Sequence, residues 1–372
     1  MADARAVTPV VALITGFPRL VARGLALRGL NLHPRHRIQL LVAPAHVEAA
    51  EALRASLPPE QAERLQVLVG ETTDVDLGLD GPTVQQVIEQ TTHIFHAESE
   101  QHGPRARLQR INVGGLANVL STARDLQALE RICVFSTAFV SGDRRGLIGE
   151  EELACGQQFN APFEETMFAA EQVARAVMPR LPITVLRPSA LIGHSRTGEA
   201  EGLTEGPNYL VRLMVRLPAE VPFLLPGRGV VPFNIVPVDY VVHAAWVIAQ
   251  APEAVGRTFH LTDPNPVSAR EACELLGELA ANRPAPLRAH WPLRLAGKVL
   301  QWTRLDRFAP DQMALLHDLT RQVTYDCSGA LELLAHSGVV CPPFEAYADV
   351  LVGWVADYER SLRSEPEHLV DR

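Results

Sequence analysis

The sequence predicts an α/β fold built on a doubly wound parallel sheet, with a smaller, mostly helical C-terminal lobe. Short apolar runs alternate with amphipathic stretches through the first half of the chain. The runs are short and rich in apolar residues, without a strict alternation of polar and apolar positions, which is typical of strands buried on both faces. Strands and helices that alternate in this way form right-handed βαβ units. Proline and glycine become denser after about residue 192, which indicates a loop-rich segment inserted before the last strand.

The apolar runs and the stretches between them give the expected elements in chain order. Strands are expected at residues 10–14, 38–42, 65–69, 93–96, 132–135, 183–187 and 258–261. Helices are expected at residues 20–30, 46–57, 83–90, 113–129 and 165–178. The apolar segment 291–302 is expected to form a core-facing or lobe-facing helix, with a peripheral membrane contact as the alternative.

These elements divide the 372 residues into a core and a second lobe. A chain of this length is sufficient for one large domain or two lobes. We expect a nucleotide-binding type of core at residues 1–191, an inserted lobe segment at 192–232, a return to the core at 233–266 and a helical C-terminal lobe at 267–372.

The composition excludes several classes of protein. Hydrophobic residues make up 47% and charged residues 21%, an ordinary globular balance. A net charge of −9 offers no basic surface for nucleic acid or an anionic membrane. The five cysteines are scattered without a C-x-x-C pair, so we expect neither disulfides nor a metal site, and a reducing, cytoplasmic location. No apolar run approaches the roughly 20 residues of a membrane span.

Several segments resemble the motifs of one family and occur in the same order along the chain. They are TGFPRLVA at residues 15–22, NVGGLANVL at 112–120, STAFVSG at 136–142, RPS at 187–189, GHSRTG at 193–198 and FNIVPVDY at 233–240. This set resembles the extended short-chain dehydrogenases/reductases (SDRs), which include the NAD-dependent epimerases/dehydratases. Within that family it resembles the thioester-reductase-like, or male-sterility, subgroup. The resemblance covers about residues 10–266 and implies a Rossmann-like, NAD(P)-binding fold.

The catalytic motif of that family is present without its two reactive side chains. Segment 163–171, FEETMFAAE, is similar to Y-E-x-[ST]-K-x-x-A-E, which puts Phe163 at the Tyr position and Met167 at the Lys position. No Tyr or Lys precedes Tyr209, so no change of register restores the pair. The resemblance implies that Thr137, at the catalytic Ser/Thr position, and Ser136 are retained. Since Phe carries no proton and Met no charge, we expect no hydride transfer by the family's route.

The resemblance also locates the cofactor positions, several of which have changed. They are Thr15, Gly16, Phe17, Arg19, Ala43, Glu71, Pro188 and Ser189. Arg19 replaces a glycine at which the backbone approaches the pyrophosphate. Ala43 stands where the subgroup places an arginine for the 2′-phosphate. Glu98 introduces a carboxylate that would repel pyrophosphate. These positions are vestigial under this interpretation, which disfavours NAD(P) as cofactor without excluding it.

Replacement chemistry would need other acid–base groups. Glu98, Glu164, Glu165, His102 and His194 could supply them if they shared one cleft, and each could equally be a surface or hydrogen-bonded side chain. Asn112 could serve as a helix N-cap.

Three functions therefore remain open. The sequence favours a non-redox ligand-binding, regulatory or partner subunit. One alternative is an NAD(P)-dependent reductase or epimerase that acts on an acyl thioester, aldehyde or ketone through a non-standard site. The other is a lyase, cyclase or isomerase in the same cleft. The expected partners are a small molecule between the lobes and a second subunit, either an identical chain or an SDR with the intact pair.

Overall fold

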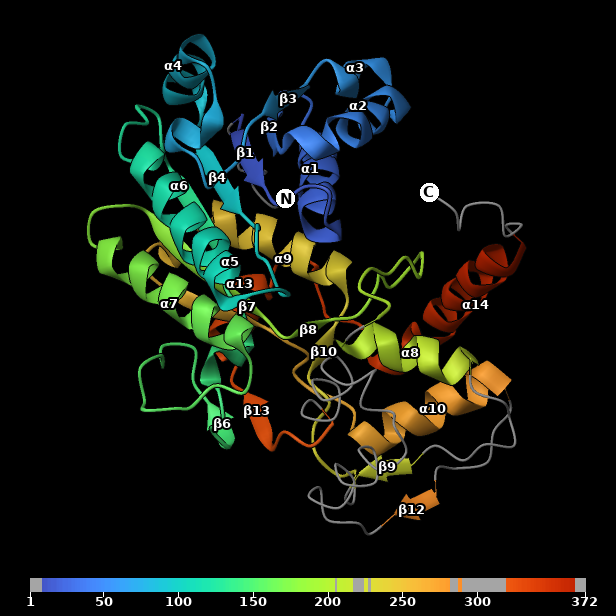
Figure 1. Cartoon of the computed structure of the whole chain (residues 1–372). Helices are drawn as coiled ribbons and strands as arrows, with labels where there is room; N and C mark the ends of the chain where they lie inside the picture. The colour runs from blue at the N-terminus through green and yellow to red at the C-terminus, as the bar shows by residue number, and fades with distance from the viewer. Residues whose placement is uncertain are drawn as a thin grey trace.

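The computed structural model describes residues 9–204, 206–216, 224–226, 229–281, 287–289 and 319–364 of the chain. Figure 1 shows a central sheet with helices on both faces and a second group of helices beside it. The predicted helix at 291–302 lies outside the described residues. No helix of the described part is long and apolar enough to cross a bilayer.

A seven-stranded parallel sheet forms the centre of the described structure. Its order is β11-β7-β5-β4-β1-β2-β3. The bounds are β1 Val11–Thr15, β2 Arg37–Val42, β3 Leu65–Val69, β4 His93–His96, β5 Arg131–Phe135, β7 Ile183–Pro188 and β11 Thr258–Leu261. Every predicted strand is confirmed to within one residue at either end. The chain proceeds outward from β1 in both directions, so the strand order reverses between β1 and β4, where doubly wound sheets bind their ligands.

Helices cover the two faces of the sheet (Figure 1). One apolar cluster joins the sheet to α1 (Leu20–Leu32) and α9 (Val238–Gln250). Another joins the opposite face to α4 (Gly81–Gln90), α6 (Leu116–Ala123) and α7 (Pro162–Val177). Shorter or peripheral elements are α2 Val47–Ser56, α3 Pro59–Ala62, α5 Arg105–Leu108, η1 Pro44–His46, η2 Val75–Gly78, η4 Ala138–Ser141 and η5 Pro252–Ala254.

The pair α1 and α9 is fixed by a close contact at Gly29. A Cβ atom at Gly29 would lie 2.5 Å from Cζ2 of Trp246, so no larger residue fits there without a shift. The indole N–H of Trp246 donates to the carbonyl of Leu25 at 3.0 Å. Because the indole is buried, this bond satisfies its one donor while the ring fills the gap between the helices.

The helix expected at residues 113–129 is different in the structure. Residues Gln109–Gly115 form a π-helical segment (η3), and α6 ends at Ala123. The prediction extended the helix because Leu126 and Leu129 continue an apolar pattern. Leu126 is indeed buried, but it is reached by a turn rather than by helix. Burial alone therefore did not distinguish these two conformations.

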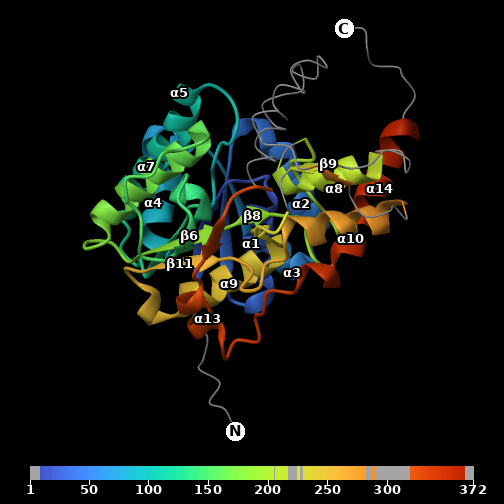
Figure 2. The same cartoon turned by 90° about the horizontal axis from the view of Figure 1, so that it is seen from below.

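The second lobe is a helical layer beside the carboxyl edge of the sheet. The helices α8 (Gly206–Arg216), α10 (Ala269–Ala281) and α14 (Ala348–Ser364) lie side by side in Figures 1 and 2 and share one apolar cluster. Two parallel strand pairs accompany them: β8 Ala190–Leu191 with β10 Ile235–Val236, and β9 Leu224–Pro226 with β12 Leu287–Ala289. The short helix η7 is Phe344–Ala346. The predicted helical C-terminal part is confirmed.

Part of the C-terminal region returns to the core. Strand β13 (Val323–Tyr325) pairs in parallel with β6 (Gly146–Ile148). Helix α13 (Ser328–Leu334) follows and contacts α9 and β11. Its Ala330 and Leu334 belong to the same apolar cluster as α1 and α9. The core is therefore completed by residues from both ends of the chain.

Candidate functional site

The sheet topology gathers the predicted site residues along one edge. Parallel strands present their carboxyl ends together, and β1, β4, β5 and β7 are consecutive neighbours. Thr15 and Gly16 follow from β1, Glu98 from β4, Ser136 and Thr137 from β5, and Pro188 and Ser189 from β7. The spatial grouping of these positions thus agrees with the SDR resemblance.

The turn after β1 keeps the close backbone approach that the fold requires. Gly16 has a φ of +98°, and a Cβ there would lie 2.7 Å from the carbonyl oxygen of Ala97. Only glycine fits this position without strain. The N–H of Arg19 donates to the carbonyl of Gly16 at 3.1 Å. Phe17, a predicted cofactor position, is instead buried in the core.

The N-terminus of α1 is bound by carboxylates of the second lobe. The N–H of Leu20 donates to a carboxylate oxygen of Glu201 at 3.0 Å. In the same turn the guanidinium of Arg23 forms an ion pair with Glu199. Arg19, the N-cap residue, makes no side-chain capping bond. The first turn of α1 therefore already carries an anion, at the place where a Rossmann helix receives pyrophosphate.

Glu98 lies at the point where the strand order reverses. Its carboxylate accepts a hydrogen bond from the Thr72 hydroxyl at 2.5 Å. Burial raises the pKa of Glu98, and the negative charge of Glu71 acts in the same direction, while the Thr72 bond and Arg19 oppose them. The predicted carboxylate is thus present in the crevice, where it favours the protonated state more than an ordinary glutamate does.

The two retained hydroxyls make different contacts. The Thr137 hydroxyl oxygen accepts from the N–H of Phe139 at 3.3 Å and so caps the short helix η4. The Ser136 hydroxyl donates to the carboxylate of Glu171 at 2.7 Å. Both side chains are buried. Each hydroxyl therefore has a structural partner within the chain.

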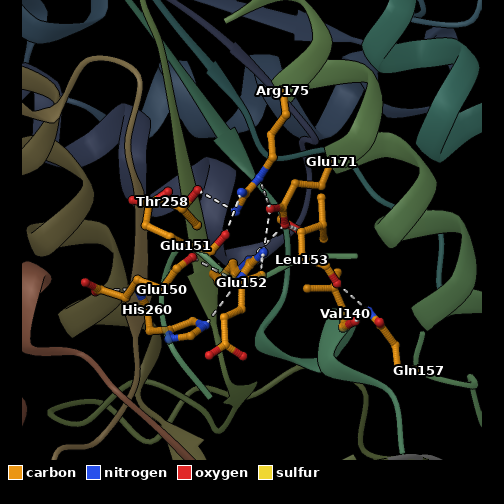
Figure 3. A network of polar contacts seen from close by, with 12 residues as sticks. Val140, Glu150, Glu151, Glu152, Leu153, Gln157, Glu171, Arg175, Thr258 and His260 are labelled. Carbon is orange, nitrogen blue, oxygen red and sulfur yellow. Dashed lines mark hydrogen bonds and ion pairs between the residues drawn. The ribbon is translucent and has the colours of Figure 1, made fainter. Parts of the chain in front are cut away.

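A buried ion pair lies behind these hydroxyls. Glu171 on α7 and Arg187 on β7 are joined at 2.6 Å, with side-chain exposures of 0% and 1%. Arg187 also donates to the carbonyls of Glu150 and Glu152, and Arg175 donates to the same Glu171 oxygen, Oε1, at 2.9 Å. Burial alone would raise the pKa of Glu171, but Arg187 and Arg175 outweigh it and the pKa is lowered. Figure 3 shows this network, in which Arg175 lies beside Glu171 and His260 contacts Arg187 at 3.3 Å.

Phe163 and Met167, at the family's Tyr and Lys positions, also have apolar surroundings in the structure. Met167 is 4% exposed and packs with Val140 and Leu153. Phe163 and Phe168 lie against this cluster. A cavity of about 10 Å³ reaches from Met167 to Glu98 and Ser136. That is room for about one water molecule.

The other acid–base candidates are held apart. Glu164 forms an ion pair with Arg321, and Glu165 forms one with Arg105. His194 accepts from the N–H of Arg196 and lies 3.9 Å from Asp239 in the first turn of α9. His102 is exposed in the loop before α5. The shared cleft of five such groups is therefore absent from the described structure.

Asn112 does not cap a helix, in contrast to the prediction. It lies within the π-helical segment, where its carbonyl accepts from the N–H of Glu100 at 2.7 Å. Its amide donates to the carbonyl of Glu100 and to the hydroxyl of Thr166, both at 2.9 Å. The side chain thus ties the loop after β4 to α7. This bridging role spans 54 residues of sequence, which a local capping rule does not consider.

The remaining predicted cofactor positions are Ala43, Glu71, Pro188 and Ser189. Ala43 follows β2 and precedes η1. Glu71 is exposed and accepts from Thr73 at 3.5 Å. Pro188 ends β7, and the buried hydroxyl of Ser189 has no hydrogen-bond partner. Among the described residues no group of three His, Cys, Asp or Glu side chains could hold a metal ion.

Comparison with known proteins identifies the family. The sequence model of an NAD-binding family described as male sterility protein matches residues 27–245, more than half of the chain. The chain belongs to this family. The resemblance to extended, thioester-reductase-like SDRs is thereby confirmed. The match to the male sterility protein family begins within α1, downstream of the turn at Gly16.

Individual relatives are distant but cover most of the chain. It is 26% identical to aldehyde reductase lnbA of Aspergillus flavus, over 88% of this chain and 34% of that protein. The fold matches the terminal R domain of the myxalamid PKS-NRPS pathway with a TM-score of 0.79, at 22% identity and with 97% and 94% of the two chains covered. Yeast methylglyoxal/isovaleraldehyde reductase Gre2 complexed with NADPH matches with a TM-score of 0.68, 13% identity and 94% and 99% coverage.

The chain is shorter than the curated relatives. It spans between 25% and 34% of the length of three of them. The comparison therefore applies to a part of those proteins.

Membership of this NAD-binding family supports a nucleotide cofactor, and several residues at the expected cofactor positions have changed. The helix end that would hold the pyrophosphate is bonded to Glu201, and the carboxylate of Glu98 lies in the adjoining crevice. Ala43 offers no cation for a 2′-phosphate. Met167 offers no charge for the ribose. The turn at Gly16 keeps its close backbone approach to Ala97.

Sequence reasoning missed three functional contacts. Glu171 is the final residue of the catalytic-helix motif, so its position was available and only its role was not assigned. Glu199 and Glu201 lie directly after the GHSRTG segment and outside every motif. The two glutamates are apparent in the sequence, but their contact with α1 is not, because Leu20 and Glu201 are 181 residues apart in sequence.

Proposed function

We propose that this chain is a non-reducing member of the male sterility protein family, and that it acts by binding rather than by hydride transfer. The observation that carries the proposal is the burial of Met167 among Val140 and Leu153. A lysine there would hold the nicotinamide ribose, and a tyrosine at Phe163 would exchange a proton with the substrate. Neither function survives in a thioether and a phenyl ring. A positioned general acid contributes about 10²–10⁴-fold, so its loss alone would reduce turnover severely.

The direct test is a turnover assay of the purified chain with NADH and NADPH. Acyl thioesters, aldehydes and ketones serve as substrates, and a relative with the intact Tyr-x-x-x-Lys pair serves as positive control. We expect the wild-type chain and its Thr137→Ala variant to consume cofactor at the same background rate. Consumption that exceeds background and is abolished by Thr137→Ala would contradict the proposal, because Thr137 occupies the one catalytic position that the sequence retains.

The expected mode of action is as a partner subunit or a small-molecule binder. Family members with an intact pair often associate through helices equivalent to α6 and α7, and both are present here. We propose that this chain pairs through them with an identical chain or an intact SDR. Native mass spectrometry of the chain, alone and mixed with such a relative, tests this.

The five free cysteines support a reducing, cytoplasmic location.

A reductase with a non-standard site is the second candidate. The name of lnbA, an aldehyde reductase, supports it, as does the membership of an NAD-binding family. Such an enzyme would need a proton donor other than residue 163. The turnover assay separates this candidate from the first.

An acid–base enzyme is the third candidate, and Glu98 favours it. Its raised pKa and its position at the carboxyl edge of the sheet are those of a general acid. The group would protonate a ligand in the crevice without any redox change. Loss of substrate turnover in Glu98→Gln, with unchanged ligand binding, would support this candidate.

A further inference from the structure

The first turn of α1 is bonded to two carboxylates of the chain itself. Glu201 accepts from the N–H of Leu20 at 3.0 Å, and Glu199 forms an ion pair with Arg23. One residue separates the two glutamates, and that residue, Ala200, is buried in the apolar cluster of the second lobe. The acidic segment is therefore anchored to the second lobe through Ala200, while the carboxylates of Glu199 and Glu201 contact α1.

These contacts satisfy the same needs that an anionic ligand would. The first N–H groups of a helix have no partner within the helix, and its N-terminus carries a partial positive charge. A phosphate on such a helix end accepts from these N–H groups. Here a carboxylate oxygen of Glu201 accepts from the N–H of Leu20. The charge of Arg23 is balanced by its ion pair with Glu199.

We infer that residues 199–201 replace the dinucleotide pyrophosphate at α1, as an anion built into the chain. The inference rests on the proposed function in one respect, since both hold that no dinucleotide is used. It adds the physical means: the place of the phosphates is filled, so a chain with a restored Tyr–Lys pair would still bind NADPH poorly. The same contacts fasten the second lobe to the Rossmann core.

Other features of the turn support a resident carboxylate. Arg19 gives no side-chain cap to α1, so the helix end is left to a group from elsewhere. Gly16 keeps its close approach to Ala97, so the turn itself has not closed over the helix end. An intact turn with an internal anion indicates substitution of the ligand rather than collapse of the site.

Inorganic pyrophosphate tests the inference without any hydride chemistry. The variants are Glu201→Ala, the near-isosteric Glu201→Gln, and Glu130→Ala as a control that changes the net charge equally at an exposed position far from α1 in sequence. Binding is followed by calorimetry and by the shift in melting temperature at millimolar pyrophosphate. We expect no response from wild type or Glu130→Ala, and at least a tenfold tighter binding in both Glu201 variants.

Two results would overturn the inference. One is pyrophosphate binding by wild type as tight as that of the Glu201 variants. The other is a lack of pyrophosphate binding by Glu201→Gln. This near-isosteric variant is expected to fold even if Glu201→Ala does not, and circular dichroism checks that each variant is folded. Either result leaves the proposed function intact, because it concerns the phosphate position alone. NADPH turnover by wild type would instead remove both.

Discussion

Glu171 and Arg187 form the most deeply buried ion pair of the described core. Because both charges are removed from water, each depends on the other and on the carbonyls around it. The Ser136 hydroxyl donates to Glu171, so the pair also helps to hold the carboxyl end of β5. These contacts give the network a structural role.

Substitution of one partner is expected to be costly. Glu171→Gln leaves the Arg187 guanidinium without its counter-charge and should lower the free energy of unfolding by about 3–5 kcal/mol. The exposed pair Glu51–Arg54 gives the matched control. Glu51→Gln should change stability by about 0–1 kcal/mol. Urea unfolding measures both, and equal effects of the two substitutions would contradict this view of the buried pair.

Glu98 and Glu100 offer a pH test with opposite signs. The pKa of Glu98 is raised by burial, so its ionisation costs stability as pH rises above its ordinary value of 4.5. Burial alone would also raise the pKa of Glu100, but the His102 N–H and Arg107 outweigh it and the pKa is lowered. That carboxylate therefore contributes stability above pH 4.5, which is lost as pH falls further.

The corresponding amide variants should diverge at neutral pH. Glu98→Gln is expected to be more stable than wild type at pH 7, and Glu100→Gln less stable. The pH-dependent part of both differences should fade at acidic pH, where the carboxyl groups are protonated. Thermal melts over a pH series measure this, and the same sign for both variants would refute the assignment of the two shifts.

At the scale of elements, the sequence predicted the sheet well because strands that are buried on both faces are rich in apolar residues. Helix ends were less accurate, since Leu126 is buried in a turn that has the spacing of a helix. At the site, Phe163 and Met167 were found because a motif fixes their spacing on α7. Glu201 could not be placed, because it contacts α1 through tertiary structure alone.

The packing of α7 gives the element-scale prediction. Met167→Lys puts an ammonium group into the apolar cluster of Val140 and Leu153 and should cost about 3 kcal/mol or more. Met167→Leu preserves the apolar character and should cost less than about 1.5 kcal/mol. Chemical denaturation compares them. A Lys variant as stable as the Leu variant would show that the site still accommodates a cation.

At the scale of the whole molecule, the C-terminal region closes the core as well as forming the second lobe. The carboxylate of Glu150 accepts from the N–H groups of His260, Gly329 and Ala330 at 3.0, 3.0 and 3.2 Å. It therefore joins β11 to the start of α13. Burial raises the pKa of Glu150, while these N–H groups act against the increase.

Removal of this junction should loosen the C-terminal segment. Glu150→Ala leaves buried N–H donors without an acceptor, at about 1–3 kcal/mol for each one that finds no substitute. We expect a lower melting temperature and faster proteolysis between residues 319 and 341. Proteolysis at the wild-type rate would show that α13 is held by its apolar contacts alone.

We propose that this Rossmann core does without its dinucleotide. The most direct test is a thermal-shift titration of the wild-type chain with NADH and NADPH. A ligand at about 100 times its dissociation constant adds roughly 2.7 kcal/mol to the free energy of unfolding. We predict no shift with either nucleotide up to millimolar concentration. A saturable upward shift, with a dissociation constant in the micromolar range, would contradict the claim.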